Sequence, residues 1–399
     1  MAGGRVDQIA TELTGTGVSR RTVLRWSGAA GMLAVGTTVV SCAPPNPGSE
    51  ADANGVALLP GFTSRIIATA GEPVAGTGFE FRAFPDGAAT FPDAEVPGGW
   101  YLAVNHEIPG GAGGVSSIRF APDGTIVDAR SICDNTSLNC AGGATPWGTW
   151  LTGEEWNGGH IWECDPTGAR PAQRRRQMGA FKHEAAAVAT DGNVYLTEDE
   201  KGGAFYRFIP DTPGDLSAGR LEVATGPLGG GTVSWKRVPV TNPALFELAT
   251  RFQVENTMRF DGGEGIATLG DLVWFSTKGD NRIWQYEVST QQVSIAYQAG
   301  GSSTLSGVDN LWVDAPTGNL FVAEDGDDMQ VVLLRPDDTV LAVAQLPGQE
   351  ASEITGPCFS PDGQRLYFSS QRNPVGPGNL PLGRTYEVTG PWDAVLGRS

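Results

Sequence analysis

The chain has few basic residues, few histidines and no long apolar run. Its 27 lysines and arginines stand against 45 aspartates and glutamates, which gives a formal net charge of −18. This excess of negative charge disfavours nucleic acid as a partner, because phosphate backbones bind to basic surfaces. The three histidines leave little scope for histidine-based catalysis. No stretch of about 18 uninterrupted, strongly apolar residues is present, so the sequence predicts no membrane-spanning helix.

Helical periodicity is also missing after residue 60. The apolar runs there are short, rich in β-branched and aromatic residues, and separated by turn sequences such as Asp191–Asn193 and Pro361–Gly363. The chain is 40% apolar and contains 11 tryptophans, which is enough for a sizeable core. The sequence therefore predicts a folded, all-β protein.

The N-terminal residues have the features of an export signal. Ser19–Arg25 (SRRTVLR) resembles a twin-arginine signal, and Val39–Cys42 (VVSC) resembles a bacterial lipobox. We therefore expect a signal peptide over residues 1–41, an acylated Cys42, a flexible tether over 42–58 and a single domain over 59–399. In this interpretation the protein is a lipoprotein of the cell envelope, held at the membrane only through the lipid on Cys42.

Four cysteines follow Cys42, namely Cys133, Cys140, Cys164 and Cys358. An even number of cysteines outside the cytoplasm favours disulfides. A bond between Cys133 and Cys140 closes the shortest loop and is the pairing we expect, with the second pair left open. None of the spacings is that of a structural zinc site.

A short motif recurs six times along the chain. It consists of an aromatic residue, an aliphatic residue and small residues, followed by polar or acidic ones, as in Trp150–Glu155 and Tyr195–Glu200. The leading aromatic residues stand at positions 101, 150, 195, 274, 321 and 367, with steps of 49, 45, 79, 47 and 46. Repeats of 40–50 residues built from short strands are typical of β-propellers. The sequence predicts a six-bladed β-propeller with an insertion within 211–260, between the third and fourth blade motifs. We expect a strand near 64–70 to complete the last blade beside 384–388.

In a propeller, equivalent strand ends meet around the central channel, so the repeated acids should form a ring. Ionised carboxylates packed around one channel repel one another and need cations. Oxygen ligands favour calcium, magnesium or manganese over zinc. Acids on solvated loop tips are the alternative for any single residue. The predicted metal ligands are Glu154, Glu155, Glu184, Glu198, Asp199, Glu264, Asp309, Glu324, Asp325 and Glu353, with Glu107 in the same set.

Several of these motifs together resemble the PhoX-type alkaline phosphatases. The likeness is carried by Asn105–Glu107 (NHE), Thr145–Glu155 (TPWGTWLTGEE), Phe181–Glu184 (FKHE) and Ser352–Pro357 (SEITGP), and it extends over most of residues 60–389. The resemblance implies an exported six-bladed propeller that cleaves phosphate esters with two ferric ions and several calcium ions. It further implies metal or phosphate contacts at Asn105, Glu154, Glu184, Glu264 and Glu353. Of these, Asn105 and Glu264 are the predicted catalytic residues.

Two positions depart from the pattern of that family. Gly153 stands where the family has a cysteine that binds iron, and Gly262 stands where it has an arginine that holds phosphate. Without the thiolate, the site should favour calcium over iron. Without the arginine, a bidentate contact to phosphoryl oxygens is lost, and Arg259 or Lys278 are candidates to replace it.

The sequence thus predicts an exported, monomeric, metal-dependent phosphatase that acts on a small phosphorylated substrate. Two alternatives stay open. One is a lactonase-like propeller hydrolase that uses a single calcium ion and a carboxylate as general base. The other is a lipid-tethered binding propeller whose calcium is structural or whose catalytic function is altered.

Overall fold

The computed structural model describes residues 50–399 except 301–302, 327, 377–380 and 399. The predicted signal peptide and Cys42 lie outside these residues. Among the described residues, no helix is long and apolar enough to cross a bilayer.

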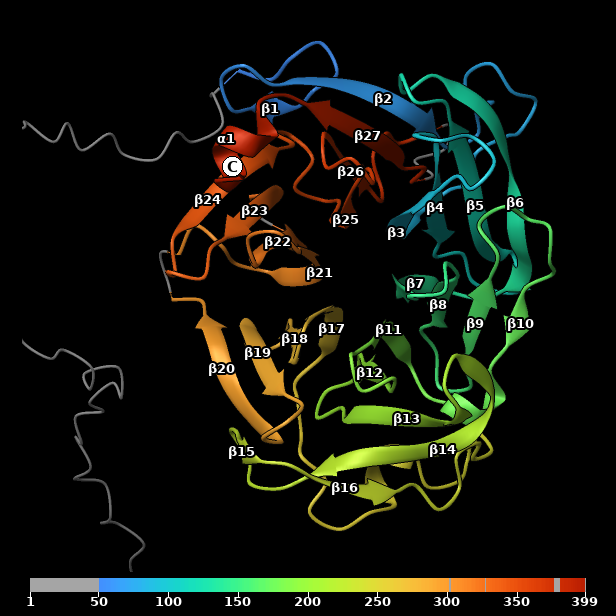
Figure 1. Ribbon diagram of the computed structural model, residues 1–399, viewed down its shortest axis with the longest axis vertical. Coiled ribbons are helices and arrows are strands. Elements are labelled where there is room, and N and C mark those ends of the chain that lie inside the picture. The colour runs from blue at the N-terminus through green and yellow to red at the C-terminus, as the bar shows by residue number, and fades with distance from the viewer. Residues whose placement is uncertain (1–49, 301–302, 327, 377–380, 399) are drawn as a thin grey trace, which may run out of the picture. The chain divides into compact units, whose positions relative to one another are not determined.

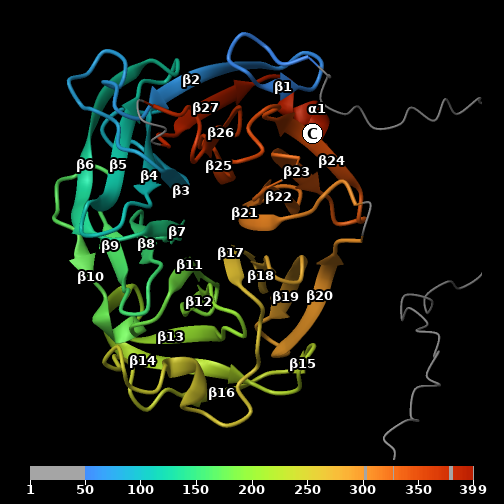
Figure 2. The same cartoon turned by 180° about the vertical axis from the view of Figure 1, so that it is seen from behind.

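Six antiparallel sheets stand in a ring around a common axis, as Figure 1 shows from one side and Figure 2 from the other. The predicted six-bladed β-propeller is confirmed. The first three sheets are β3 (Pro85–Pro92), β4 (Trp100–His106), β5 (Gly113–Phe120) and β6 (Ile126–Thr136); β7 (Asn139–Ala144), β8 (Trp150–Glu154), β9 (Ile161–Cys164) and β10 (Gln173–Arg174); and β11 (His183–Val188), β12 (Val194–Glu198), β13 (Phe205–Thr212), β14 (Asp215–Thr225) and β16 (Ser234–Arg237).

The other three sheets complete the ring. They are β17 (Gly263–Leu269), β18 (Leu272–Thr277), β19 (Arg282–Glu287), β20 (Gln292–Gln298) and β15 (Gly231–Thr232); β21 (Val308–Asp314), β22 (Asn319–Glu324), β23 (Gln330–Leu334), β24 (Val340–Gln345) and β1 (Ala57–Leu58); and β25 (Ile354–Phe359), β26 (Arg365–Ser370), β27 (Arg384–Thr389) and β2 (Thr63–Thr69). Short helical turns are η1 (Arg176–Met178), η2 (Thr250–Phe252) and α1 (Trp392–Leu396).

The N-terminal strand closes the ring, as the sequence predicts. Strand β2 pairs antiparallel with β27, from Thr63 opposite Thr389 to Thr69 opposite Arg384. Strand β1 pairs with β24 of the fifth sheet, and Val56 before it is fully buried. The packed domain therefore begins a few residues before the expected boundary at 59.

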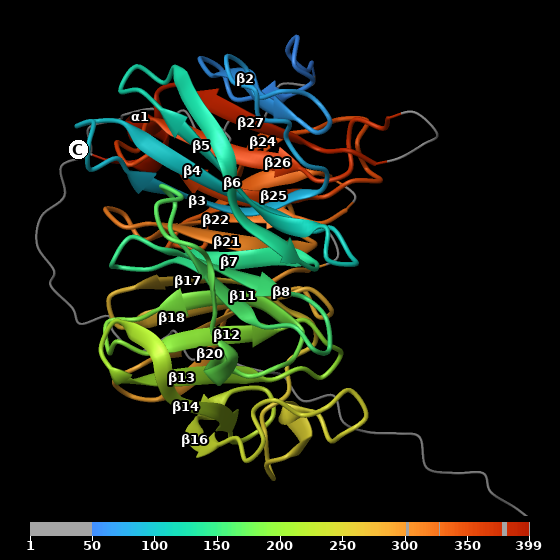
Figure 3. The same cartoon turned by 90° about the vertical axis from the view of Figure 1, so that its right-hand side faces the viewer.

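The predicted insertion extends two neighbouring sheets. Strand β16 adds to β14 of the third sheet, and β15 adds to β20 of the fourth. The side view of Figure 3 shows β16 and the adjoining loops at the outer edge of the ring. The insertion thus enlarges the rim and contributes no strand to the channel.

The leading aromatic residue of each repeat belongs to the core between sheets. All six of these side chains are buried, and Tyr195 packs in one cluster with Phe205 of its own sheet and Phe275 of the next. The ring of Tyr195 also contacts that of Tyr286 in the next sheet, with centroids 5.6 Å apart. Large apolar rings at this position hold neighbouring sheets face to face, which explains why the repeat is visible in the sequence.

Every innermost strand carries a register shift at the same place, next to the channel. The shifts fall between Pro85 and Ala88, Asn139 and Gly142, His183 and Ala186, Gly263 and Ile266, Val308 and Leu311, and Thr355 and Cys358. A bulge of this kind re-aims a side chain. Small residues follow it where the inner strands approach each other: a Cβ atom on Gly87 would lie 2.6 Å from Cα of Ala141.

Ring closure depends on a buried carboxylate in β27. Glu387 is 2% exposed and accepts from Arg65 of β2 at 2.9 Å, from Arg365 of β26 at 2.9 Å and from the hydroxyl of Tyr367 at 2.8 Å. We expect Glu387→Ala to lower the free energy of unfolding by about 3 kcal/mol, because it leaves the buried hydroxyl of Tyr367 and two partly exposed arginines without their shared acceptor. Urea unfolding measures this.

The matched control is Glu95→Ala. Glu95 also pairs with an arginine, Arg119, but its side chain is 80% exposed, so its removal should cost less than about 1 kcal/mol. Equal effects of the two substitutions would contradict the role of Glu387.

Candidate metal centre

The bulge in each inner strand turns one side chain into the channel. These six residues, which we call the inner ring, line a cavity of about 100 Å³ and are Asp86, Cys140, Glu184, Glu264, Asp309 and Thr355. One comes from each sheet, because each inner strand carries the same register shift. The fold therefore brings together residues that are up to 269 positions apart in the sequence.

A second ring is formed by the residues that directly follow the second strand of each sheet. This strand-end ring consists of Glu107, Glu155, Asp199, Lys278, Asp325 and Gln371. Backbone hydrogen bonds fix several of these positions, such as that from the Glu107 N–H to the carbonyl of Phe84 at 2.9 Å. Glu353 and Arg372 complete the lining of the cavity.

Seven of the ten predicted metal ligands lie in this cavity. They are Glu155, Glu184, Asp199, Glu264, Asp309, Asp325 and Glu353, and Glu107 lies with them. The sequence interpretation missed Asp86, Cys140 and Arg372. Cys140 could have been found, because it stands ten residues before Trp150, the interval that separates Glu264 from Trp274.

The predicted ligand set needs correction at Glu154, Glu198 and Glu324, which lie outside the cavity. Each precedes a member of the strand-end ring, and successive residues of a strand point to opposite sides. Each accepts a hydrogen bond from the backbone N–H six residues later: His160 at 3.2 Å, Ala204 at 3.0 Å and Gln330 at 3.2 Å. Glu154, Glu198 and Glu324 therefore hold the loops that follow them. The acid directly after each of them faces the channel.

Asn105 also has a different place from the predicted one. It is fully buried, its amide donates to the carbonyls of Cys140 and Ala141 at 2.8 and 3.0 Å, and its carbonyl accepts from Trp150 at 2.8 Å. These contacts occupy the side chain and do not reach the cavity. Asn105 therefore holds the backbone at Cys140 and Ala141 and does not line the cavity, and its predicted catalytic role stays a prediction.

The cysteines are arranged differently from the prediction. The four cysteines of the described residues are free, so the expected bond between Cys133 and Cys140 is absent. Cys140 faces the cavity, with its Sγ 3.6 Å from Oδ2 of Asp86. Cys133 lies instead in an apolar cluster that also contains Cys164. Burial, together with the charges of Asp86 and Glu184, raises the pKa of the Cys140 thiol well above its usual value.

The expectation that the cavity lacks a thiol is therefore wrong. Gly153 lies on β8 against the third sheet, where a Cβ atom would be 2.6 Å from the carbonyl oxygen of His183 and 2.7 Å from that of Glu184. No side chain fits there without a backbone shift. The thiol comes from Cys140 on the neighbouring strand β7 of the same sheet.

The position of Gly262 borders the cavity. A Cβ atom there would lie 3.2 Å from Oδ1 of Asp199. Arg259, one candidate for the missing cation, lies over the ring of Phe252 and donates to the carbonyl of Gly202, away from the cavity. Lys278 does line the cavity, as does Arg372.

Nine carboxylates and two cationic side chains share the cavity. Burial and the neighbouring charges of Asp199 and Glu107 raise the pKa of Glu155 to about 8. Burial, followed by the charges of Glu264 and Glu155, raises the pKa of Glu184 well above its usual value. Both carboxylate oxygens of Glu184 are buried without a hydrogen-bond partner. An anionic group in that position needs a cation or a proton.

The residues present fit metal ions. Four trios have ligand atoms within 4.8 Å of one another: Asp86, Glu107 and Cys140; Cys140, Glu155 and Glu184; Glu184, Glu264 and Asp309; and Asp309, Asp325 and Glu353. The last two trios offer only oxygen, which suits calcium and other hard cations. The first two add a sulfur ligand, which suits transition metals such as iron.

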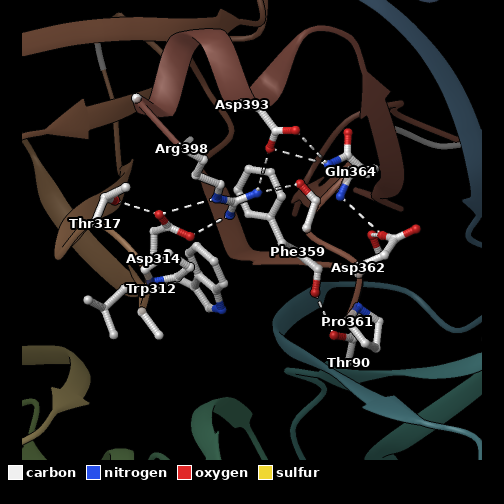
Figure 4. Close-up of a pocket in the computed structure, with 16 residues that line it drawn as sticks. Thr90, Trp312, Asp314, Thr317, Phe359, Pro361, Asp362, Gln364, Asp393 and Arg398 are labelled. Atoms are coloured by element: carbon white, nitrogen blue, oxygen red, sulfur yellow. Dashed lines mark hydrogen bonds and ion pairs between the residues drawn. The ribbon is translucent and has the colours of Figure 1, made fainter.

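A second, larger cavity of about 690 Å³ lies at the other end of strands β21 and β25. Figure 4 shows Arg398 at its centre, paired with Asp314 and lying over Phe359. Its side chains pair with one another, as Gln364 does with Asp393. None of the nine carboxylates lines this cavity, so it is not the candidate metal centre.

The raised carboxylate pKa values predict how stability depends on pH when metal is removed. The folded state binds protons more tightly than the unfolded state, so its stability is greatest below the ordinary carboxylate range and is lost as pH rises. For Glu155 the loss extends through about pH 8. In excess chelator, the melting temperature should fall between pH 5 and pH 9. Millimolar calcium should weaken this trend, and a melting temperature that rises with pH in chelator would contradict it.

Comparisons with known proteins agree with this fold. The sequence matches the family of alkaline phosphatase PhoX over residues 103–160, 156–286 and 283–374, while no curated protein matches it. The structure of Pseudomonas fluorescens PhoX in complex with vanadate, a transition-state analogue, has a TM-score of 0.70 at 19% identity, covering 87% of this chain and 97% of its own. A protein of unknown function from Dyadobacter fermentans has a TM-score of 0.50 at 10% identity, covering 83% and 100%. Because the family matches extend through most of the propeller, this chain belongs to the alkaline phosphatase PhoX family.

Proposed function

We propose that this protein hydrolyses phosphate esters at a multinuclear metal centre in the propeller channel. The observation that carries the proposal is the set of nine carboxylates in one cavity, with both oxygens of the buried Glu184 lacking a partner. Membership of the PhoX family supports a phosphoric ester hydrolase, and the carboxylate trios support its dependence on metal.

The proposed ligands divide into two parts of the cavity. The carboxylate trios at Glu184, Glu264, Asp309, Asp325 and Glu353 would hold calcium. The trios that share Cys140 add Asp86, Glu107 and Glu155 and would hold iron. Bound there, such ions would polarise phosphoryl oxygens and make water a stronger nucleophile.

Arg372 is the side chain best placed to bind the phosphoryl group. Its Nη1 lies 3.1 Å from Oε2 of Glu353, its side chain is 36% exposed, and it lines the cavity. The backbone N–H of Arg372 donates to the hydroxyl of Ser352 at 2.9 Å, which fixes the start of the side chain. A guanidinium offers two parallel donors to phosphoryl oxygens. We assign to Arg372 the contact that Gly262 cannot make.

The proposal includes the cellular location. Members of this family are typically exported, and the twin-arginine motif at Ser19–Arg25 and the lipobox ending at Cys42 support export followed by lipid attachment. The substrate would be a small phosphorylated molecule outside the cytoplasm, and the protein would act as a monomer. The lactonase-like alternative with a single calcium ion is not favoured, because nine carboxylates exceed the six to eight ligands that one calcium ion takes.

Activity and metal content test the proposal together. Purified protein should hydrolyse p-nitrophenyl phosphate, should lose this activity in chelator and should contain more than one metal ion by elemental analysis. Glu184→Gln should lower kcat/KM at least about 100-fold and reduce the metal content, because it removes a buried charge that faces the ions. Glu154→Gln is the matched control, since Glu154 lies outside the cavity and should leave the metal content unchanged. A wild-type protein with neither metal nor activity would refute the function.

The role of Arg372 has a separate test. Arg372→Ala should lower kcat/KM for p-nitrophenyl phosphate by about 10- to 100-fold and weaken inhibition by inorganic phosphate, because the bidentate donor is lost. Arg372→Lys keeps the charge without the planar fork and should fall in between. Arg259→Ala, a matched arginine outside the cavity, should change kcat/KM less than about threefold. Similar kinetics for Arg372→Ala and Arg259→Ala would show that Arg372 does not bind the phosphoryl group.

A further inference from the structure

Lys278 is the basic member of the strand-end ring. It follows β18 directly, at the position that four other sheets fill with Glu107, Glu155, Asp199 and Asp325. Its backbone N–H donates to the carbonyl of Gly262 at 2.9 Å. Lys278 therefore places a positive charge at the position where four other sheets have a carboxylate that could bind metal.

The ammonium group of Lys278 contacts three carboxylates at similar distances. Its Nζ lies 3.2 Å from Oε1 of Glu264, 3.1 Å from Oδ2 of Asp309 and 3.1 Å from Oδ2 of Asp325. These acids come from two sheets, the fourth and the fifth. A lysine ammonium has N–H donors and no acceptor. Lys278 donates to Asp309 and Asp325 and pairs with Glu264 through charge alone. This environment resembles that of a small bound cation.

The position of Nζ coincides with part of the potential metal centre. Glu264 and Asp309 belong to one trio, and Asp309 and Asp325 belong to the next. Nζ therefore lies where two all-oxygen trios meet. Of the lysines and arginines in the described part of the chain, Lys278 alone pairs with more than one carboxylate of the cavity. Lys182 and Arg372 contact one each.

The other side of the cavity lacks such a built-in cation. Asp86 and Glu107 accept from the amide of Gln371 at 2.5 and 2.8 Å, and neither forms an ion pair among the described residues. Glu155 has only Lys182, at 3.6 Å. Positive charge on this side must therefore come from bound ions or protons, whereas Glu264, Asp309 and Asp325 already share an ammonium group.

We propose that the ammonium group of Lys278 is a built-in counter-ion that occupies one cation position of the metal centre. The inference rests on the proposed function, since it assumes that ions bind the remaining carboxylates. The chain then binds one divalent ion fewer than its carboxylates could hold. The side with Glu264, Asp309 and Asp325 then holds one calcium ion fewer, and the remaining ions bind the carboxylate oxygens that Lys278 leaves free.

Counting ions in the full-length protein tests this inference. Wild type and Lys278→Met are equilibrated with calcium, freed of excess ion by gel filtration and analysed for metal per chain. Lys278→Met removes the charge and keeps an unbranched side chain, so it should bind one additional calcium ion. In chelator its melting temperature should fall below that of wild type, and added calcium should remove most of the difference. Lys278→Gln repeats the measurement if the methionine variant does not fold.

Two controls isolate the effect of position and charge. Lys278→Arg keeps a positive charge at the same place and should leave the ion count unchanged. Lys182→Met removes a lysine that pairs with a single cavity carboxylate, Glu155, and should also leave it unchanged. An ion count in Lys278→Met or Lys278→Gln that equals or falls below that of wild type would overturn the inference. A wild type without any bound ion would instead refute the proposed function, whereas calcium bound only by Lys278→Met would still support the role of Lys278.

Discussion

Repulsion among buried carboxylates is the constraint on which the centre of this protein depends. Two unit charges about 4 Å apart interact with about 4 kcal/mol at an effective dielectric constant of about 20, and the ligand atoms within each trio here lie within 4.8 Å of one another. Nine such groups cannot all be ionised in one cavity without cations. Lys278 and Arg372 supply two positive charges, and the remaining imbalance is the physical reason to expect multivalent ions.

The alternation of side chains along a strand separates the structural acids from those of the cavity. In Glu154–Glu155 and Glu198–Asp199, the first carboxylate holds the following loop through a backbone N–H and the second reaches the channel. Glu198 and Glu184 differ in whether protein groups balance their charge. Glu198 is paired with Arg251 at 2.7 Å and accepts from Tyr206, so its charge is balanced by protein. Glu184 has no such partner, so its charge requires a bound cation or a proton.

The sequence predicted the ring better than the contents of its centre. The aromatic repeat reveals the number of sheets because each sheet needs a large side chain against its neighbour, and closure by the N-terminal strand follows from the blade count. The inner ring is harder to predict, because its side chains are aimed by a bulge that changes the register. Asp86 stands 15 residues before Tyr101, a longer interval than in the other repeats. Cys140 stands ten residues before Trp150, an interval typical of the other repeats. The even number of cysteines nevertheless favoured a disulfide, so Cys140 was not assigned to the ring of acids.

Closure of the ring and binding of ions are linked, because the cavity takes one residue from every sheet. Strand β2 leads into the first sheet and pairs with β27 of the sixth, so opening this contact would free the first sheet, which carries Asp86, from the sixth, which carries Thr355. Ions that bind only the closed ring stabilise it by about 4 kcal/mol each when their concentration is 1,000 times the dissociation constant. Metal binding would thus support the contact between β2 and β27, although that contact lies at the outer edge of the propeller. The acids whose mutual repulsion destabilises the channel are the same groups through which bound ions would hold the six sheets together.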